Sequence, residues 1–388
     1  MDKLRFKDIN GNNFPAWEEY SLDKVANVYQ PQTISTNMFS TDGFPVYGAN
    51  GIIGLYKNYN HENDQVLVSC RGENCGTVNL SSGKAWITGN TMVVNVDGNN
   101  AVDKKFLYYQ LSNQNLRYLI SGSGQPQIVG NVINKHLILL PKKQEQEKIG
   151  GFLSSFDKLI QKQKEKIGLL KELKKGYLQQ MFPVKGSNIP KIRFKGFTEA
   201  WEQRNVSEIT SFHKQGYYTT ESYSDTKKYY LLRGTDFSQN SLILKDTPKI
   251  DASEKDYQAF KVEIGDFLIV RSGTVGTYGI VYDDIPAIFG SYLINFRFDQ
   301  SIVMNEFFGL FYQSHLFRSQ LSKIIQQSAN TNINAENIKS TSIQLPLLQE
   351  QRKISIFLES IDKLITLHQH KLEKLEEMKK GYMQRLFI

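Results

Sequence analysis

The chain has 388 residues, of which 40% are apolar, and a formal net charge of +8. Its length exceeds what one hydrophobic core usually organises, so we expect more than one domain. No run of 18 apolar residues is present and the start lacks the apolar stretch of a signal peptide, so we expect a cytoplasmic protein with no membrane partner. Two cysteines are too few for a disulfide framework or a zinc site.

The first domain follows a short opening motif, KLRF at residues 3–6 with Trp17 behind it. Runs of β-branched and aromatic residues are broken by glycine, as in VLVSCRGENCGTVNL and AWITGNTMVVNV. This pattern is typical of twisted strands joined by tight turns. FLYYQLSNQNLRYLI then predicts one helix, followed by the loop SGSGQPQIVGNVI. We therefore predict an α+β domain over residues 1–140.

A long helix is predicted next, over residues 141–183. Apolar residues recur at alternating spacings of four and three from Ile149 to Met181, which is the seam of a coiled coil. Pro141 stands where the missing amide costs a helix least. Gly176 lies inside this pattern, as Gly381 does in the second half, so we expect either fraying of the helix or a close backbone approach at both positions.

The second half of the chain repeats this order. KIRF at residues 191–194 and Trp201 precede a second variable domain, 184–345 with its linker, and a second long helix follows at 346–388. Between residues 141–182 and 346–387, 22 of 42 positions are identical without a gap, at an offset of 205 residues. FFGLFYQSHLFRSQLSKII predicts one helix, and QQSANTNINAENI matches the first loop in position. A repeat this long indicates duplicated domains.

The predicted fold class is therefore α+β, with two similar globular domains separated by two long helices that form an antiparallel coiled coil. The duplication predicts a pseudo-two-fold axis, and an axis that crosses the helices sets them antiparallel. Gln163 and His368 occupy equivalent seam positions at the helix midpoints. We expect them to meet and fix the register; the alternative is that both point to solvent.

Most of the positive charge belongs to the two helices. Residues 142–182 carry +5 and residues 347–388 carry +2, which leaves only +1 for the rest of the chain. Any nucleic-acid surface on the variable domains must then be a local patch, because their total charge supplies no field.

The order of KLRF and tryptophan, variable domain, LP…QEQ…I helix ending in KKGYLQQMF, second domain and second helix resembles the specificity subunit of type I restriction-modification systems. The resemblance covers the whole chain. It implies that each variable domain is a target recognition domain for one half of a bipartite sequence in double-stranded DNA. It also implies that the coiled coil spaces the domains and docks two methyltransferase subunits, through which restriction and translocase subunits assemble. S-adenosylmethionine, ATP and Mg²⁺ would belong to those partners, with no cofactor or metal in this chain.

Base-reading residues are expected on glycine-rich loops, because arginine reads guanine and asparagine or glutamine reads adenine through two hydrogen bonds. Tyrosines near such loops are candidates for stacking or phosphate contact. For each candidate the alternative is a role in a turn or at the edge of the core. The DNA-binding candidates are Arg71, Arg233, Arg271, Gln125, Gln127, Asn330, Asn332, Tyr47 and Tyr230.

We find no catalytic motif. The sequence contains no P-loop, no HExxH, no amino-methyltransferase motif and no zinc-finger spacing among its six histidines. We therefore expect a non-catalytic subunit. Two alternatives stay open: a coiled-coil scaffold whose variable domains bind proteins, and a nuclease that uses an unrecognised carboxylate site such as Asp283 and Asp284.

Overall fold

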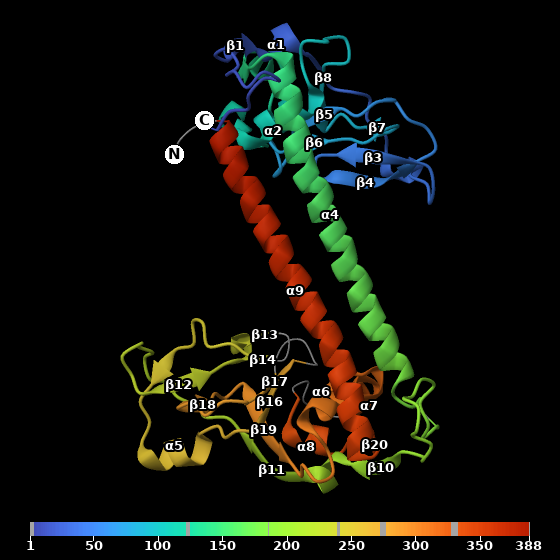
Figure 1. Ribbon diagram of the computed structural model, residues 1–388, viewed down its shortest axis with the longest axis vertical. Helices are drawn as coiled ribbons and strands as arrows, with labels where there is room; N and C mark the ends of the chain where they lie inside the picture. The colour runs from blue at the N-terminus through green and yellow to red at the C-terminus, as the bar shows by residue number, and fades with distance from the viewer. Residues whose placement is uncertain are drawn as a thin grey trace. The chain divides into compact units, whose positions relative to one another are not determined.

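Figure 1 shows the computed structural model, which describes residues 4–121, 125–184, 186–238, 241–271, 277–326 and 333–387. The chain divides into two compact units. Unit 1 comprises Met1–Glu165 with Gln369–Ile388, and unit 2 comprises Lys166–His368. Each unit therefore holds one globular domain together with parts of both long helices.

The globular domain of unit 1 contains two sheets and a short ribbon. The larger sheet has the order β2-β8-β5-β6 (Asn27–Tyr29, Thr91–Asn95, Val66–Ser69, Val78–Leu80), and its neighbouring strands are antiparallel. The smaller has the order β4-β3-β7 (Gly51–Tyr56, Phe44–Gly48, Trp86–Ile87). β1 (Glu18–Ser21) pairs with β9 (Leu137–Leu140). The helices are α1 (Leu22–Val25), α2 (Lys104–Asn113) and α3 (Gly130–Asn134).

Unit 2 repeats the strand order of both sheets and the ribbon. Its larger sheet has the order β11-β19-β16-β17-β14-β13 (Thr210–Gln215, Leu293–Phe298, Phe267–Val270, Tyr278–Ile280, Ser241–Leu242, Phe237–Ser238), in which β14 and β13 are two further strands. The smaller has the order β15-β12-β18 (Lys249–Ile250, Tyr229–Leu232, Ala287–Phe289), and β10 (Glu202–Asn205) pairs with β20 (Ser342–Leu345). The helices are α5 (Glu254–Phe260), α6 (Asn305–Gln313), α7 (His315–Gln326) and α8 (Ala335–Lys339).

Strand pairing shows that the two domains share one fold. β5 lies between β6 and β8, and β16 lies between β17 and β19, in each case with antiparallel neighbours. β3 is antiparallel to β4 and parallel to β7, just as β12 is antiparallel to β15 and parallel to β18. The matched loop residues Ile128 and Ile333, and Ile133 and Ile338, are all buried. The prediction of one α+β fold occurring twice is confirmed.

The predicted single helix of each domain is shorter than expected. In unit 1, α2 ends at Asn113 and a 3-10 helix, Leu116–Leu119, follows. In unit 2 the segment divides into α6 and α7, because extended backbone at Ser314 interrupts it. The Ser314 hydroxyl donates to the carbonyl of Phe311 at 2.6 Å and accepts from the amide of Phe317 at 3.3 Å. One serine thus serves both helix ends, which is a common function of this residue type.

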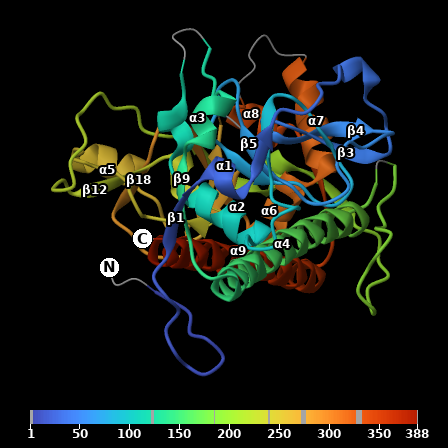
Figure 2. The same ribbon diagram turned by 90° about the horizontal axis from the view of Figure 1, so that it is seen from above.

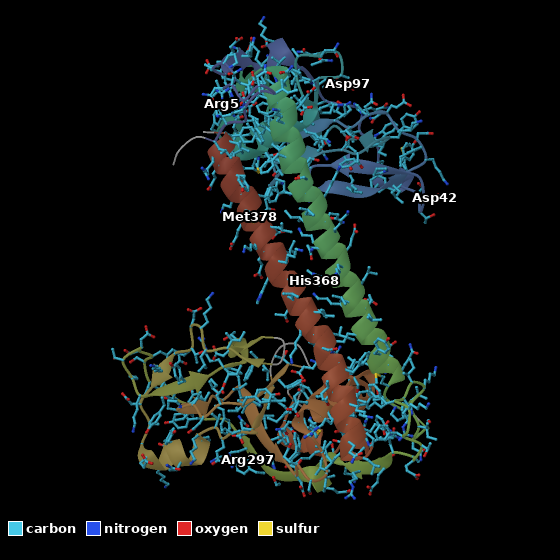
Figure 3. All side chains as sticks on the ribbon, viewed as in Figure 1. Arg5, Asp42, Asp97, Arg297, His368 and Met378 are labelled. Atoms are coloured by element: carbon cyan, nitrogen blue, oxygen red, sulfur yellow. The ribbon has the colours of Figure 1, made fainter. Side chains whose placement is uncertain are left out.

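The long helices are α4 (Lys143–Gln180) and α9 (Leu348–Leu386), which begin two residues after Pro141 and Pro346. The predicted seam residues of both helices are buried or half-buried, which confirms the heptad pattern. Gln163 belongs to unit 1 and His368, labelled in Figure 3, to unit 2, so their pairing stays a prediction.

Within each unit the two helices run antiparallel. In unit 1, Asp157 accepts from Lys379 at 2.6 Å and Lys164 pairs with Glu376 at 3.0 Å, so one residue number rises as the other falls. In unit 2, Lys174 pairs with Asp362 at 2.8 Å. Asp157 and Lys174 lie 205 residues before Asp362 and Lys379, so the two seam ion pairs are copies of one another.

The helix glycines do not behave as expected. Both helices continue through Gly176 and Gly381, so neither end frays there. Among the described residues, nothing lies within 4 Å of the place where a Cβ would stand at either position. Gly150 differs, because a Cβ there would come within 2.6 Å of Asp103 Oδ1, the side chain that caps α2. That glycine lets α2 lie close beside α4 (Figure 1, Figure 2).

Candidate nucleic-acid interface

Three loops of unit 1 are tied together at the end of β5. The hydroxyl of Ser69, the last residue of β5, donates to the Ala49 carbonyl at 2.7 Å, which joins the start of the loop after β5 to the β3–β4 turn. The Gly72 amide donates to the Pro126 carbonyl at 3.1 Å, which joins the same loop to the segment before α3. Arg71 forms a β-bridge with Gln127. Segments distant in the sequence thus form one loop surface.

This surface brings predicted candidates together. Arg71, Gln125 and Gln127 are all exposed, and the bridge places Arg71 next to Gln127. A guanidinium and amide groups on one exposed surface match the groups that read guanine and adenine in the major groove. Whether these residues contact DNA stays a prediction.

Two further residues on this surface escaped sequence reasoning. Asn50 forms the tip of the β3–β4 hairpin, and Asn74 lies in the loop after β5. The Asn74 amide donates to the Asn50 side-chain oxygen, so the hairpin tip is held against the loop that contains Arg71. The signal in the sequence was the asparagine–glycine step at residues 50–51 between two strands, which is a strong hairpin signature.

The corresponding surface of unit 2 is built differently. The Arg271 amide donates to the Tyr292 carbonyl at 3.0 Å, and in unit 1 the Cys70 amide donates to the Asn90 carbonyl at 3.0 Å. The counterpart of Arg271 is therefore Cys70, one residue before Arg71. Tyr292 is 67% exposed beside the half-buried Arg271. Asn330 and Asn332, also predicted for this surface, lie outside the described residues.

Three other candidates lie in more enclosed surroundings. Arg233 donates to Asp236 Oδ1 at 3.0 Å and to the Asp246 carbonyl at 2.9 Å, and its pKa is raised above the ordinary value mainly by the hydrogen bond to Asp236. Tyr47 is buried in the core, where its hydroxyl accepts from the Ser82 amide at 3.2 Å. Tyr230 is half-buried, with Lys249 over its ring at 4.7 Å. These contacts favour roles in turns and at the core edge.

The model of the type I restriction modification DNA specificity domain matches residues 16–175 and, a second time, residues 198–377. The chain belongs to this family. Each match covers one globular domain and most of the long helix that follows it, so we call the two globular parts specificity domains. DNA sequence recognition is the function of the family.

Individual relatives agree with this assignment. The chain is 27% identical over 340 residues to the specificity subunit of the type I restriction enzyme MjaVIII from Methanocaldococcus jannaschii, covering 84% of this chain and 78% of that protein. It is 24% identical over 355 residues to a putative type I specificity subunit from Haemophilus influenzae, covering 88% and 87%.

The fold is shared with solved structures. The S subunit of a type I restriction-modification system from M. genitalium superposes with a TM-score of 0.71 at 17% identity, covering 100% of this chain and 99% of that one. A chain from a study of type I complex assembly and conformational transition superposes with a TM-score of 0.54, covering 97% and 99%. The match over the whole chain confirms the predicted fold class, with two globular domains and two long helices.

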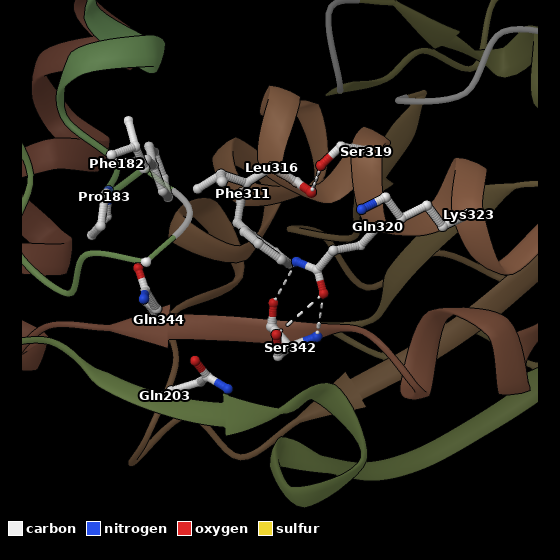
Figure 4. A pocket seen from close by; sticks show the side chains of 12 residues that line it. Phe182, Pro183, Gln203, Phe311, Leu316, Ser319, Gln320, Lys323, Ser342 and Gln344 are labelled. Atoms are coloured by element: carbon white, nitrogen blue, oxygen red, sulfur yellow. Dashed lines mark hydrogen bonds between the residues drawn. The ribbon is translucent and has the colours of Figure 1, made fainter.

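Unit 2 of the specificity protein also contains a cavity of about 300 Å³ between α7 and β20 (Figure 4). Gln320 is held there by Ser342, whose amide donates to it at 2.8 Å and whose carbonyl accepts from it at 2.9 Å. The described lining combines apolar side chains, such as Phe182, Phe311 and Leu316, with amides, hydroxyls and Lys323, and it includes no carboxylate or histidine.

The described part of the chain holds no cluster of three or more histidine, cysteine, aspartate or glutamate side chains arranged for a metal ion. Cys70 and Cys75 are buried free thiols, and burial raises the pKa of both above the ordinary value. Within the described ranges, no helix is both long and apolar enough to cross a membrane.

Proposed function

We propose that the chain is the DNA-recognition subunit of a type I restriction-modification complex, and that each specificity domain reads one half of a split target. The observation that carries this proposal is one fold occurring twice with different loops at equivalent places. Arg71 and Gln127 border the loop surface in unit 1, whereas Arg271 and Tyr292 occupy the corresponding place in unit 2. Different loops on one scaffold suit two different half-sites.

The two long helices would dock two copies of one methyltransferase. Leu159 and Leu364 are equivalent positions, as are Leu173 and Met378, and all four are between 40% and 47% exposed. Unit 1 contains Leu159 and Met378, the latter labelled in Figure 3, and unit 2 contains Leu173 and Leu364. Each unit thus presents the same two exposed apolar positions, one from each helix. Two matching surfaces favour two copies of one partner.

The helix glycines support the same docking surface. A glycine inside a helix costs about 1 kcal/mol relative to alanine. No described residue approaches Gly176 or Gly381 closely enough to require a glycine there. The absent side chain leaves space for an approaching helix of a partner, once in each unit.

The chemistry would belong to the partners. In this proposal the methyltransferase subunits bind S-adenosylmethionine and methylate adenine. The restriction and translocase subunits, joined through them, use ATP and Mg²⁺. The specificity chain itself contributes double-stranded DNA binding and no catalytic group.

The test is to co-express the chain with its methyltransferase subunit and to map N6-methyladenine across the host genome. We expect a split motif of two short specific halves around a fixed gap. A stable complex that methylates no split motif would contradict the proposal and favour a protein-binding scaffold. Metal-dependent cleavage of DNA by the isolated chain would instead favour a nuclease.

A further inference from the structure

Each specificity domain is attached to the long helices in part through a buried carboxylate. In unit 1, Arg5 of the opening motif binds Glu145 on the first turn of α4 with two hydrogen bonds, of 3.0 and 2.6 Å. In unit 2, Arg193 binds Glu350 on the first turn of α9 at 2.7 and 2.8 Å. Both glutamate side chains are 0% exposed. Each pair joins the segment before a domain to the helix that follows the domain.

The next residue on each helix ties down the domain itself. Gln146 accepts from the amide of Asp103 at 2.8 Å and donates to the carbonyl of Ala101 at 3.0 Å, both just before α2. In unit 2, Gln351 accepts from the amide of Met304 at 3.0 Å and donates to the carbonyl of Ile302 at 2.9 Å, just before α6. The glutamate and glutamine together hold the domain at two places.

The end of the other helix completes the attachment. In unit 1 the Leu4 amide donates to the Arg385 carbonyl at 2.9 Å, and in unit 2 the Ile192 amide donates to the Gln180 carbonyl at 2.9 Å. The opening motif beside each buried carboxylate is therefore fixed to both α4 and α9. The geometry is the same in two domains whose reading loops differ.

A two-point ion pair is directional, whereas apolar packing tolerates small rotations. The carboxylate and the guanidinium are both planar, so their paired hydrogen bonds fix an angle as well as a distance. A contact needed for stability alone has no reason to fix an angle, and a buried ion pair is a poor source of net stability. The repeated geometry points to orientation as the property that is maintained.

We propose that Glu145 and Glu350 are positioning residues for DNA recognition, which fix the orientation of each specificity domain on the helices and so restrict the gap length between the two half-sites. This inference rests on the proposed function. α4 and α9 each continue from one unit into the other, so an angle lost at either attachment changes the spacing available to the two reading surfaces.

The experiment compares Glu145→Gln, Glu350→Gln and the double variant in the full chain, co-expressed with the methyltransferase subunit. Glutamine keeps the size of the side chain and removes the charge that holds the arginine. We expect unchanged half-site sequences, with methylation at gaps one base pair longer or shorter rising by roughly tenfold relative to the native gap. The double variant should relax the gap further.

Glu147→Gln is the matched control, since Glu147 lies two residues away on α4, is exposed, and pairs with Lys143 at 4.0 Å. It should leave the gap unchanged. Arg5→Met with Glu145→Leu replaces the buried pair by an apolar contact, leaves no buried charge to unfold the domain, and should relax the gap as Glu145→Gln does.

Two results would overturn the inference. One is a folded variant that loses methylation at every site equally while the gap stays fixed, because the pair would then serve stability alone. The other is a changed half-site sequence, because the glutamate would then act in base reading. If the native chain itself gives no split motif, the proposed function has failed, and that failure is visible before any variant is compared.

Discussion

The two units use the same residues where they meet the helices and different residues where the reading loops lie. Arg5 and Arg193 hold equivalent glutamates, and Gln146 and Gln351 make equivalent hydrogen bonds. In the loops that follow the strands, the two units carry different residues. For example, the structural counterpart of Arg271 is Cys70. Duplication has therefore preserved the attachment while the loops diverged, as expected if the partner of the helices is common and the targets are distinct.

The seam ion pairs show an intermediate case. Asp157 in unit 1 also accepts from Tyr109 of α2 at 2.5 Å, whereas in unit 2 it is Lys174 that donates to Gln313 of α6, at 3.3 Å. The domain of unit 1 thus contacts the acidic residue of its seam ion pair, and the domain of unit 2 contacts the basic residue. The two helices are similar in sequence, and each domain contacts them through a different side chain.

The largest effect is expected at an aromatic contact that occurs once in each unit. Trp201 is buried against Phe182 and Phe307, with ring centroids 5.8 and 5.7 Å apart. Trp201→Ala should lower the free energy of unfolding of unit 2 by about 3–5 kcal/mol, because it removes a large buried ring. Trp17 is only half-buried, so Trp17→Ala should cost unit 1 less.

Urea unfolding followed by hydrogen exchange in each unit measures both changes. Trp201→Phe keeps most of the contact and serves as the control. Equal losses in the two units would contradict the difference in burial.

A medium effect is expected from the loops that differ. Arg71→Ala should weaken discrimination at one position of the first half-site by about 1–3 kcal/mol, since a bidentate contact to guanine is worth that much. The second half-site should be unaffected. Methylation mapping of the variant measures both halves in one experiment.

Arg71→Lys, which keeps the charge and loses the two-point geometry, separates base reading from simple phosphate attraction. A uniform loss at all sequences in both variants would place Arg71 on the phosphate backbone.

The smallest effect is a difference in acid sensitivity. His136 in unit 1 contacts Tyr118 at 2.6 Å and Gln114 at 2.7 Å, and burial lowers its pKa below the ordinary value. Burial also lowers the pKa of His61. The unfolded chain, with a histidine pKa near about 6.5, then binds more protons than the folded one below that pH. These groups contribute stability that is complete above about pH 6.5 and is lost as the pH falls.

We expect His136→Gln to flatten the pH dependence of unit 1 by less than about 1 kcal/mol between pH 7.5 and 5.5. Hydrogen exchange at the two pH values reports each unit separately. An unchanged slope in unit 1 would show that His136 does not titrate on unfolding.

Local sequence patterns predicted the long helices and the class of the domains, but not how the strands pair. Heptads are local patterns, so the seam from Ile149 to Met181 predicted α4 correctly from sequence alone. The alternation of strands with glycine predicted an α+β domain, because strands and turns leave short-range signals. The order of the strands required the structure, since pairs such as β3 with β7 join residues about forty positions apart.

The site was predictable only in part. Arg71 and Gln127 are separate candidates in the sequence and are bridged in the structure, whereas nothing local indicates Asn50, because its contact with Asn74 is long-range. Tyr47 is a candidate because a tyrosine can stack or contact phosphate, and its burial depends on packing that no local pattern reveals. For Gly176 the sequence predicts fraying or a close contact, but α4 continues through it and no described residue lies within 4 Å of the place where its Cβ would stand.

Unit 1 includes the end of α9, and this has a consequence for synthesis. Unit 2 is one continuous stretch of chain, Lys166–His368, whereas unit 1 requires Gln369–Ile388 in addition. Leu386 is fully buried in the core of unit 1, and Phe387 packs against Trp17 and Phe106. The domain that leaves the ribosome first must therefore wait for the last turn of α9 before its core closes, so the domain made first is finished last.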